Sequence, residues 1–149
     1  MLLYFAGPLF NDGELAFNES LTNQIEELDY QVFLPQRNGF NFDEEPYISM
    51  KPEIRAKAIF DLDWENLLEA DVFLYVLDGR IPDEGAAVAL GIVHTHKKLS
   101  DRKQLIIGLH TDTRAAFINQ KLNPMIFAPM DFIAKSVKEL LDYLKNYNC

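Results

Sequence analysis

The chain has 149 residues, of which 48% are hydrophobic and 25% are charged, so we expect one soluble globular domain spanning residues 1–149. Its formal net charge of −9 repels the phosphates of DNA and RNA, which argues against a general nucleic-acid-binding function. The single cysteine, Cys149, cannot form a disulfide framework, and no segment reaches the roughly 18 apolar residues of a membrane span. We therefore expect a cytoplasmic protein that does not bind membranes.

Short apolar runs alternate along the chain with segments in which apolar residues recur at helical spacing. The runs are typical of buried strands, which we expect over residues 2–6, 31–35, 72–77, 104–109 and 125–128. Helical spacing predicts helices over residues 14–28, 53–69, 84–98 and 132–147, the first and last capped by Asp12 and Asp131. Residues 36–51 are polar and aromatic and predict a loop over a site. The alternation predicts an α/β fold with an open, mostly parallel sheet and helices on both faces.

The turn after the third predicted strand, LDGRIPDEG, gathers acidic residues at the carboxyl edge of the sheet, where ligands bind in such folds. Asp78, Asp83 and Glu84 are the acids, and Gly85 lets a ligand approach the backbone closely. One interpretation is a polar site with carboxylates directed at a ligand. The other is that these acids only cap the next helix and offset its dipole.

The remaining polar residues narrow the chemistry. On the helix before this strand, Asp61 and Glu65 are four residues apart and share a face, whereas Asp63 lies off that face and can point inward. The three histidines have no metal-ligand spacing, and the sequence has no glycine-rich phosphate loop. We therefore expect no metal and no cofactor.

Four segments in matching order resemble the nucleoside 2-deoxyribosyltransferase family over nearly the whole chain: YFAGPLF, DLDWENLLEAD, LDGRIPDEGAAVALG and LNPMI. The resemblance implies a flavodoxin-like α/β fold. It also implies transfer of 2-deoxyribose between purine and pyrimidine bases through a covalent deoxyribosyl-glutamate intermediate. The partners would then be 2′-deoxynucleosides and free nucleobases. Members of the family assemble as homo-oligomers with shared active sites, and we expect the same here.

The resemblance assigns catalytic roles to four positions. The nucleophilic glutamate of the family corresponds to Ala89, whose methyl group cannot attack a sugar. Asp83 matches the aspartate that contacts the base and would protonate it as it departs, and Asp63 matches a second aspartate near the base. Tyr4 matches the tyrosine that orients the glutamate. Cleavage of an N-glycosidic bond requires an acid for the leaving base and a carboxylate for the oxocarbenium-like sugar, which explains these residue types.

The resemblance also assigns binding roles. Gly7 and Phe10 fall in the segment that packs against the base. Asn123 matches the asparagine that reaches the sugar hydroxyl in the site of a neighbouring subunit, and Met125 follows it in the same motif.

Ala89 leaves two explanations and three functions open. The glutamate was either replaced deliberately, to trap intact substrate, or lost in a natural homologue. The first function is the transferase, with this chain an inactive form that binds nucleosides. The second is a deoxynucleoside 5′-monophosphate N-glycosidase, and the third is a catalytically dead nucleoside-binding protein. Loss of a covalent nucleophile removes many decades of rate, so we expect the chain to bind nucleosides and to turn over very slowly.

Overall fold

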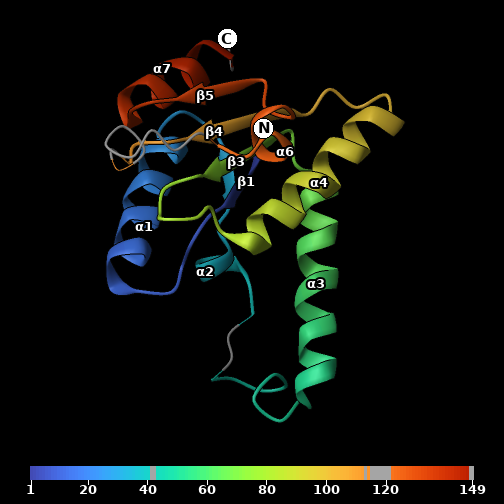
Figure 1. Cartoon of the computed structure of the whole chain (residues 1–149). Coiled ribbons are helices and arrows are strands. Elements are labelled where there is room, and N and C mark those ends of the chain that lie inside the picture. The colour runs from blue at the N-terminus through green and yellow to red at the C-terminus, as the bar shows by residue number, and fades with distance from the viewer. Residues whose placement is uncertain (41–42, 113, 115–121, 148–149) are drawn as a thin grey trace.

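A computed structural model of the chain describes residues 1–40, 43–112, 114 and 122–147 (Figure 1). Its strands are β1 (Leu2–Ala6), β2 (Gln31–Phe33), β3 (Val72–Val76), β4 (Leu105–Leu109) and β5 (Phe132–Ala134). Its helices are α1 (Asp12–Glu26), α2 (Pro35–Asn38), α3 (Pro52–Glu69), α4 (Glu84–Leu99), α6 (Pro124–Phe127) and α7 (Val137–Tyr147). Cys149 lies outside the described residues.

The five strands form one parallel sheet in the order β2-β1-β3-β4-β5. This is the flavodoxin-like order, and it confirms the predicted α/β fold with a parallel sheet. The chain winds outward in opposite directions from β1 and β3, so the crevice beyond the carboxyl ends of these two strands is the expected place for a ligand.

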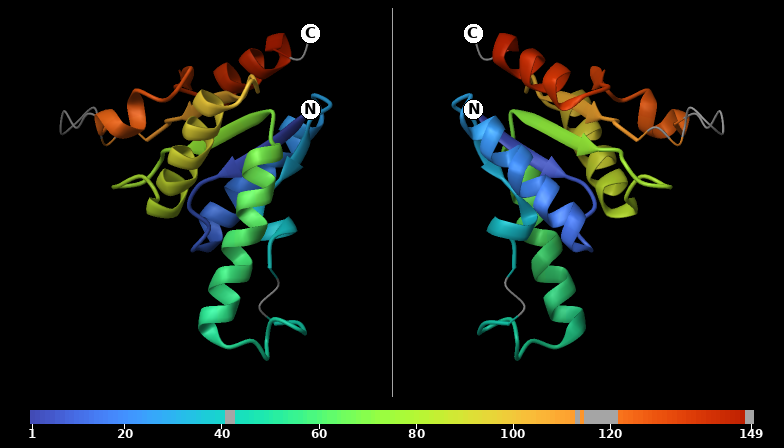
Figure 2. Two further views of the ribbon diagram at one scale, coloured as in Figure 1. Left: turned by 90° about the vertical axis from the view of Figure 1, so that its right-hand side faces the viewer. Right: turned by 90° about the vertical axis from the view of Figure 1, so that its left-hand side faces the viewer.

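Helices cover both faces of the sheet, as the sequence predicts (Figure 2). On one face α1 and α7 pack against alternate strand residues, among them Leu3, Phe5 and Leu74. On the other face α3 and α4 pack side by side over the residues in between, among them Tyr4 and Phe73. The amino-terminal half of α3 extends well beyond the edge of the sheet (Figure 1). Among the described residues no helix is both long and apolar enough to cross a membrane.

The prediction for the C-terminal region was wrong in two elements. Residues 125–128 do not form a strand. Instead they lie in and just after α6, which begins at Pro124. Proline suits the first turn of a helix, and the Asn123 side chain accepts the Met125 N–H at 2.9 Å. The last strand is β5, which pairs with β4 within the segment predicted as the start of the final helix.

Two predicted helix caps were also wrong. The Asp131 carboxylate accepts a hydrogen bond from the Ile106 N–H at 2.8 Å and forms an ion pair with Lys97 at 2.6 Å. It therefore binds to β4 and α4 and does not cap α7. At α1 the cap is Asn11 rather than Asp12, because the Asn11 side chain accepts the Glu14 N–H at 3.0 Å. Residues 36–51 are mostly turns, as predicted, but they include the end of the short helix α2.

Candidate active site

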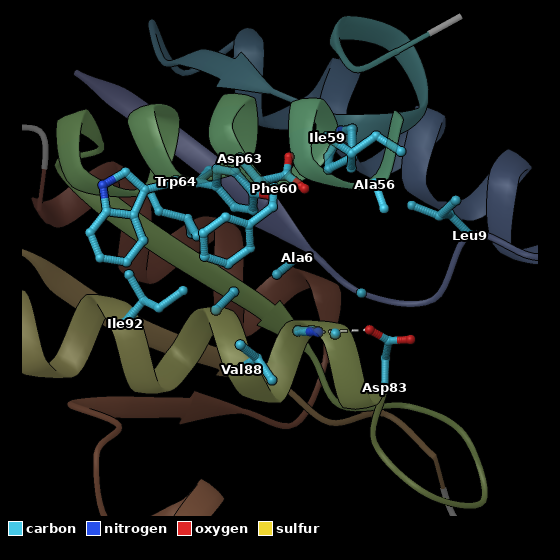
Figure 3. Close-up of a pocket in the computed structure, with 17 residues that line it drawn as sticks. Ala6, Leu9, Ala56, Ile59, Phe60, Asp63, Trp64, Asp83, Val88 and Ile92 are labelled. Atoms are coloured by element: carbon cyan, nitrogen blue, oxygen red, sulfur yellow. Dashed lines mark hydrogen bonds between the residues drawn. The ribbon is translucent and has the colours of Figure 1, made fainter. Parts of the chain in front are cut away.

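A cavity of about 380 Å³ opens between α3 and α4, beside the carboxyl half of β1 (Figure 3). Its walls come from β1 and the loop that follows it, from Pro35, and from the facing sides of the two helices. Six of the nine residues predicted for the site line it together: Tyr4, Gly7, Asp63, Asp83, Gly85 and Ala89. The cavity lies at the β1–β3 crevice where flavodoxin-like folds bind ligands.

Tyr4 and Asp63 form a polar pair on the cavity wall. Tyr4 is buried in β1, where its ring stacks between Phe33 and Phe73 at centroid distances of 5.2 and 6.1 Å. Its hydroxyl lies near the Asp63 carboxyl, and both side chains line the cavity. Asp63 therefore points inward, as its position in the helical pattern predicts.

Burial gives this pair unusual proton affinities. Removal from water raises the pKa of the Asp63 carboxyl above its ordinary value, and the nearby Tyr4 hydroxyl partly offsets the rise. Burial, and then the nearby Asp63, raise the pKa of the Tyr4 hydroxyl. Tyr4 is thus a neutral hydrogen-bond donor, and Asp63 holds a proton more readily than an exposed aspartate does.

Asp83 is both the N-cap of α4 and part of the cavity wall. Its Oδ2 accepts the Ala86 N–H at 2.7 Å, and its main-chain oxygen accepts the Tyr75 hydroxyl at 2.5 Å. The capping interpretation of this acid is therefore correct. The ligand-site interpretation is compatible with it, because the same carboxylate lines the cavity (Figure 3).

Small residues keep the cavity open. Gly85, Ala86 and Ala89 form much of the α4 wall, and Ala89 is only 8% exposed. On the opposite side a Cβ atom at Gly7 would lie 2.9 Å from Cβ of Val76, so only glycine allows the chain to pass there without a shift. Alanine at position 89 leaves space where a longer side chain would extend into the cavity.

Three predicted residues lie outside this cavity. Phe10 is 77% exposed, and Met125 is 80% exposed. Asn123 uses its side-chain oxygen to cap α6. The predicted role of Asn123 is in the site of a neighbouring subunit, so its position here leaves that prediction untested.

Comparison with known proteins decides the family. The model of the nucleoside 2-deoxyribosyltransferase family matches residues 3–137 of the chain. The chain belongs to this family. No curated protein matches the chain. Family and fold together support an enzyme of the deoxyribosyltransferase or glycosidase type, with nucleosides and nucleobases as the substrate class.

Three solved structures are similar to this deoxyribosyltransferase-family chain. A conserved protein from Enterococcus faecalis V583 is 27% identical, with a TM-score of 0.80 over 99% of this chain and 98% of that one. A 2-deoxyribosyltransferase from Bacillus psychrosaccharolyticus is 17% identical, with a TM-score of 0.72 over 96% and 92%. The CMP N-glycosidase BcmB from Clostridium botulinum is 19% identical, with a TM-score of 0.55 over 99% of both chains. The last two similarities are evidence for the fold.

The apolar mouth of the cavity was not predicted from the sequence. Phe60 and Trp64 on α3 lie with ring centroids 5.9 Å apart, and Val88 and Ile92 on α4 face them across the cavity (Figure 3). Helical spacing could have found Phe60, three residues from Asp63, and Ile92, three residues from Ala89, because residues three or four apart share a helix face. Trp64 and Val88 lie four residues from Phe60 and Ile92. Phe60 and Trp64 remain 50% and 42% exposed, and Val88 is also exposed.

The charges around the cavity are all acidic. Asp63 and Asp83 are the only ionisable acids among the described lining residues, and these residues include no lysine and no arginine. In the described part of the chain, no group of three or more His, Cys, Asp or Glu side chains could hold a metal ion. The site can therefore donate a proton and accept hydrogen bonds, but it offers no cationic side chain to a phosphate.

Proposed function

We propose that the cavity binds 2′-deoxynucleosides and free nucleobases and belongs to a deoxyribose-transfer site in which position 89 is the place of the attacking carboxylate. The supporting observation is that Tyr4, Asp63 and Asp83 surround Ala89 in one cavity. Its volume of about 380 Å³ is typical of small-molecule sites. We infer that the chain acts as one domain in the cytoplasm and that, with Ala89, it binds nucleosides and turns over very slowly.

The proposed chemistry gives each acid a separate task. The raised pKa of Asp63 favours it over Asp83, our prediction from the sequence, as the group that protonates the leaving base. Asp83, held by the α4 terminus, accepts a hydrogen bond from the base. A glutamate at position 89 would form a bond to C1′ while the bond from C1′ to the base nitrogen breaks, and an acceptor base would then reverse the sequence.

The test is base exchange with the Ala89→Glu variant beside the unaltered chain. Each protein is incubated with deoxyinosine and free adenine, and deoxyadenosine is followed by chromatography. We expect exchange with Ala89→Glu only, because the carboxylate restores the attacking group. Ala89→Gln, which has the same shape without a nucleophilic carboxylate, is the matched control and should stay inactive. No base exchange by Ala89→Glu, with nucleoside still bound, would instead support a catalytically dead binding protein.

A second candidate is hydrolysis of a deoxynucleoside 5′-monophosphate, which fits the activity printed for the BcmB neighbour. The acidic lining argues against it, because a bound 5′-phosphate would face Asp63 and Asp83 without a lysine or arginine among the described lining residues. Base release by Ala89→Glu from deoxycytidine or deoxyguanosine 5′-monophosphate, but not from the nucleosides, would favour this candidate over the transferase.

We also propose that the chain forms a homo-oligomer with shared sites. Asn123 and Met125 lie outside the cavity of their own chain, and Phe60, Trp64 and Val88 leave apolar surface at its mouth. A neighbouring subunit would cover this surface and complete the site. Sedimentation equilibrium should give a mass above that of one chain, and Val88→Glu should lower it. A monomer at micromolar concentration would refute the proposal.

A further inference from the structure

The space beside Ala89 is open, although the rest of the proposed site is intact. Ala89 sits on the cavity wall with Gly85 and Ala86 one turn before it along α4, so the α4 wall is made of small residues on this side, and the larger Val88 and Ile92 line the mouth. Ala89 itself is 8% exposed, which means that the gap is recessed in the cavity and not on open surface. A small molecule at this point would occupy the place of a carboxylate attached to position 89.

The groups that assist departure of the base do not depend on position 89. Tyr4 lies on β1 and Asp63 on α3, so neither side chain is positioned by α4, and both line the cavity. Asp83 is held by its own bond to the Ala86 N–H. A bound nucleoside would therefore meet an acid for its base but no attacking group for its sugar.

The charge of the lining limits what can enter the gap. With Asp63 and Asp83 as the charged groups of the described lining, a dianion such as phosphate is repelled. Burial favours the protonated form of Asp63, which weakens the repulsion felt by a single negative charge. Small monoanions of carboxylate size are the best match to both the space and the charge.

We propose that the gap beside Ala89 accepts a small external nucleophile, of the size of azide or formate, which attacks C1′ of a bound 2′-deoxynucleoside. The proposal rests on the proposed function. With azide, a bond forms between its terminal nitrogen and C1′, and the bond from C1′ to the base nitrogen breaks. The electron pair stays on the base, which takes the proton of Asp63, and solvent then reprotonates Asp63. The products are the free base and 2-deoxyribosyl azide with inverted configuration at C1′.

The experiment measures base release from deoxyinosine by the unaltered chain in sodium azide or sodium formate, with sodium chloride at equal ionic strength as control. Hypoxanthine is quantified by chromatography, and the sugar product is identified by mass spectrometry and proton NMR. We expect azide to raise the rate by about tenfold or more and to give the α-deoxyribosyl azide. Ala89→Gln, which fills the gap without adding a nucleophile, should lose this acceleration.

Two results would overturn the proposal. One is an equal rate in azide and chloride, and the other is equal acceleration of Ala89→Gln, since azide would then react outside the gap. Ala89→Glu is assayed for base exchange in parallel. If that variant transfers deoxyribose while azide and formate leave the rate of base release by the unaltered chain unchanged, the external-nucleophile proposal fails and the proposed function stands. If neither reacts, both are refuted.

Discussion

Substitutions at Asp83 separate its two roles, because the carboxylate both caps α4 and lines the cavity. Asp83→Ala removes the acceptor for the Ala86 N–H, and loss of an N-cap costs about 1 kcal/mol of unfolding free energy. For a chain of this size that is a fall of roughly 2–4 °C in Tm. Asp83→Asn keeps an oxygen that accepts the same N–H, so its Tm should stay within about 1 °C of the unaltered chain.

Both Asp83→Asn and Asp83→Ala should bind nucleoside more weakly, although only Asp83→Ala is expected to lose stability. Both lose the charged oxygen that we propose accepts a hydrogen bond from the base, and such a bond contributes about 1.5–3 kcal/mol. Calorimetric titration with deoxyinosine should therefore show Kd weaker by roughly 10- to 150-fold for Asp83→Asn as well as Asp83→Ala. Asn11→Ala is the matched control, because it removes the cap of α1 outside this cavity. It should lower Tm and leave Kd unchanged.

If Asp83→Asn binds deoxyinosine as tightly as the unaltered chain does, the proposed hydrogen bond between the base and Asp83 is refuted. The carboxylate would then act only as a helix cap, which is the alternative that the sequence leaves open. A Tm of Asp83→Ala equal to that of the unaltered chain would refute the capping role instead.

Three further predictions concern proton binding, folding and ligand detection. The folded pKa of Asp63 is raised, so its contribution to unfolding free energy is full below about pH 4 and is lost as pH rises. The stability of Asp63→Asn relative to the unaltered chain should therefore increase from about pH 4 to 7, and a constant difference in urea unfolding would contradict this. Gln104→Leu should lower the unfolding free energy by about 2 kcal/mol in the same assay, because the buried amide donates to the Leu67 and Ala70 carbonyls at 3.0 and 2.8 Å. A loss near zero would show that these hydrogen bonds do not stabilise the fold. Trp64 is the single tryptophan and lines the cavity, so deoxyinosine should change its fluorescence, and unchanged emission at saturation would place the ligand elsewhere.

The strands that the sequence predicts well are those with long, fully buried apolar runs. β3 and β4 lie in the middle of the sheet with helices on both faces, so nearly every residue is apolar and the pattern is unambiguous. β5 was not predicted because its three residues, Phe132–Ala134, are too few to show a period of their own. Residues 125–128, MIFA, were misassigned because a short apolar run fits a strand or a helix equally well. The flavodoxin-like fold was implied by the family resemblance, since periodicity carries no information about which strands pair.

The site was predictable where a motif carries it and not where only packing does. Tyr4, Asp63 and Asp83 are polar residues in distinctive segments, and the fold brings them together. Phe60 and Trp64 are of residue types that are common in protein cores. Only the packing of α3 beside α4 shows that they face a cavity. Phe10 belongs to the predicted base-packing segment but is exposed to solvent, whereas Leu9 of the same segment lines the cavity.

The two halves of the proposed chemistry lie on different elements, so one can be absent while the other persists. The acid half is the Tyr4–Asp63 pair, held by β1 and α3, and the attacking half is position 89 on α4. Ala89 contributes only a methyl group to the wall, so exchanging it removes neither the Tyr4–Asp63 pair nor the Asp83 cap. A single substitution should therefore restore transfer without redesign of the cavity. For the same reason a diffusible nucleophile can act in place of the missing side chain, because the geometry that protonates the base is already assembled.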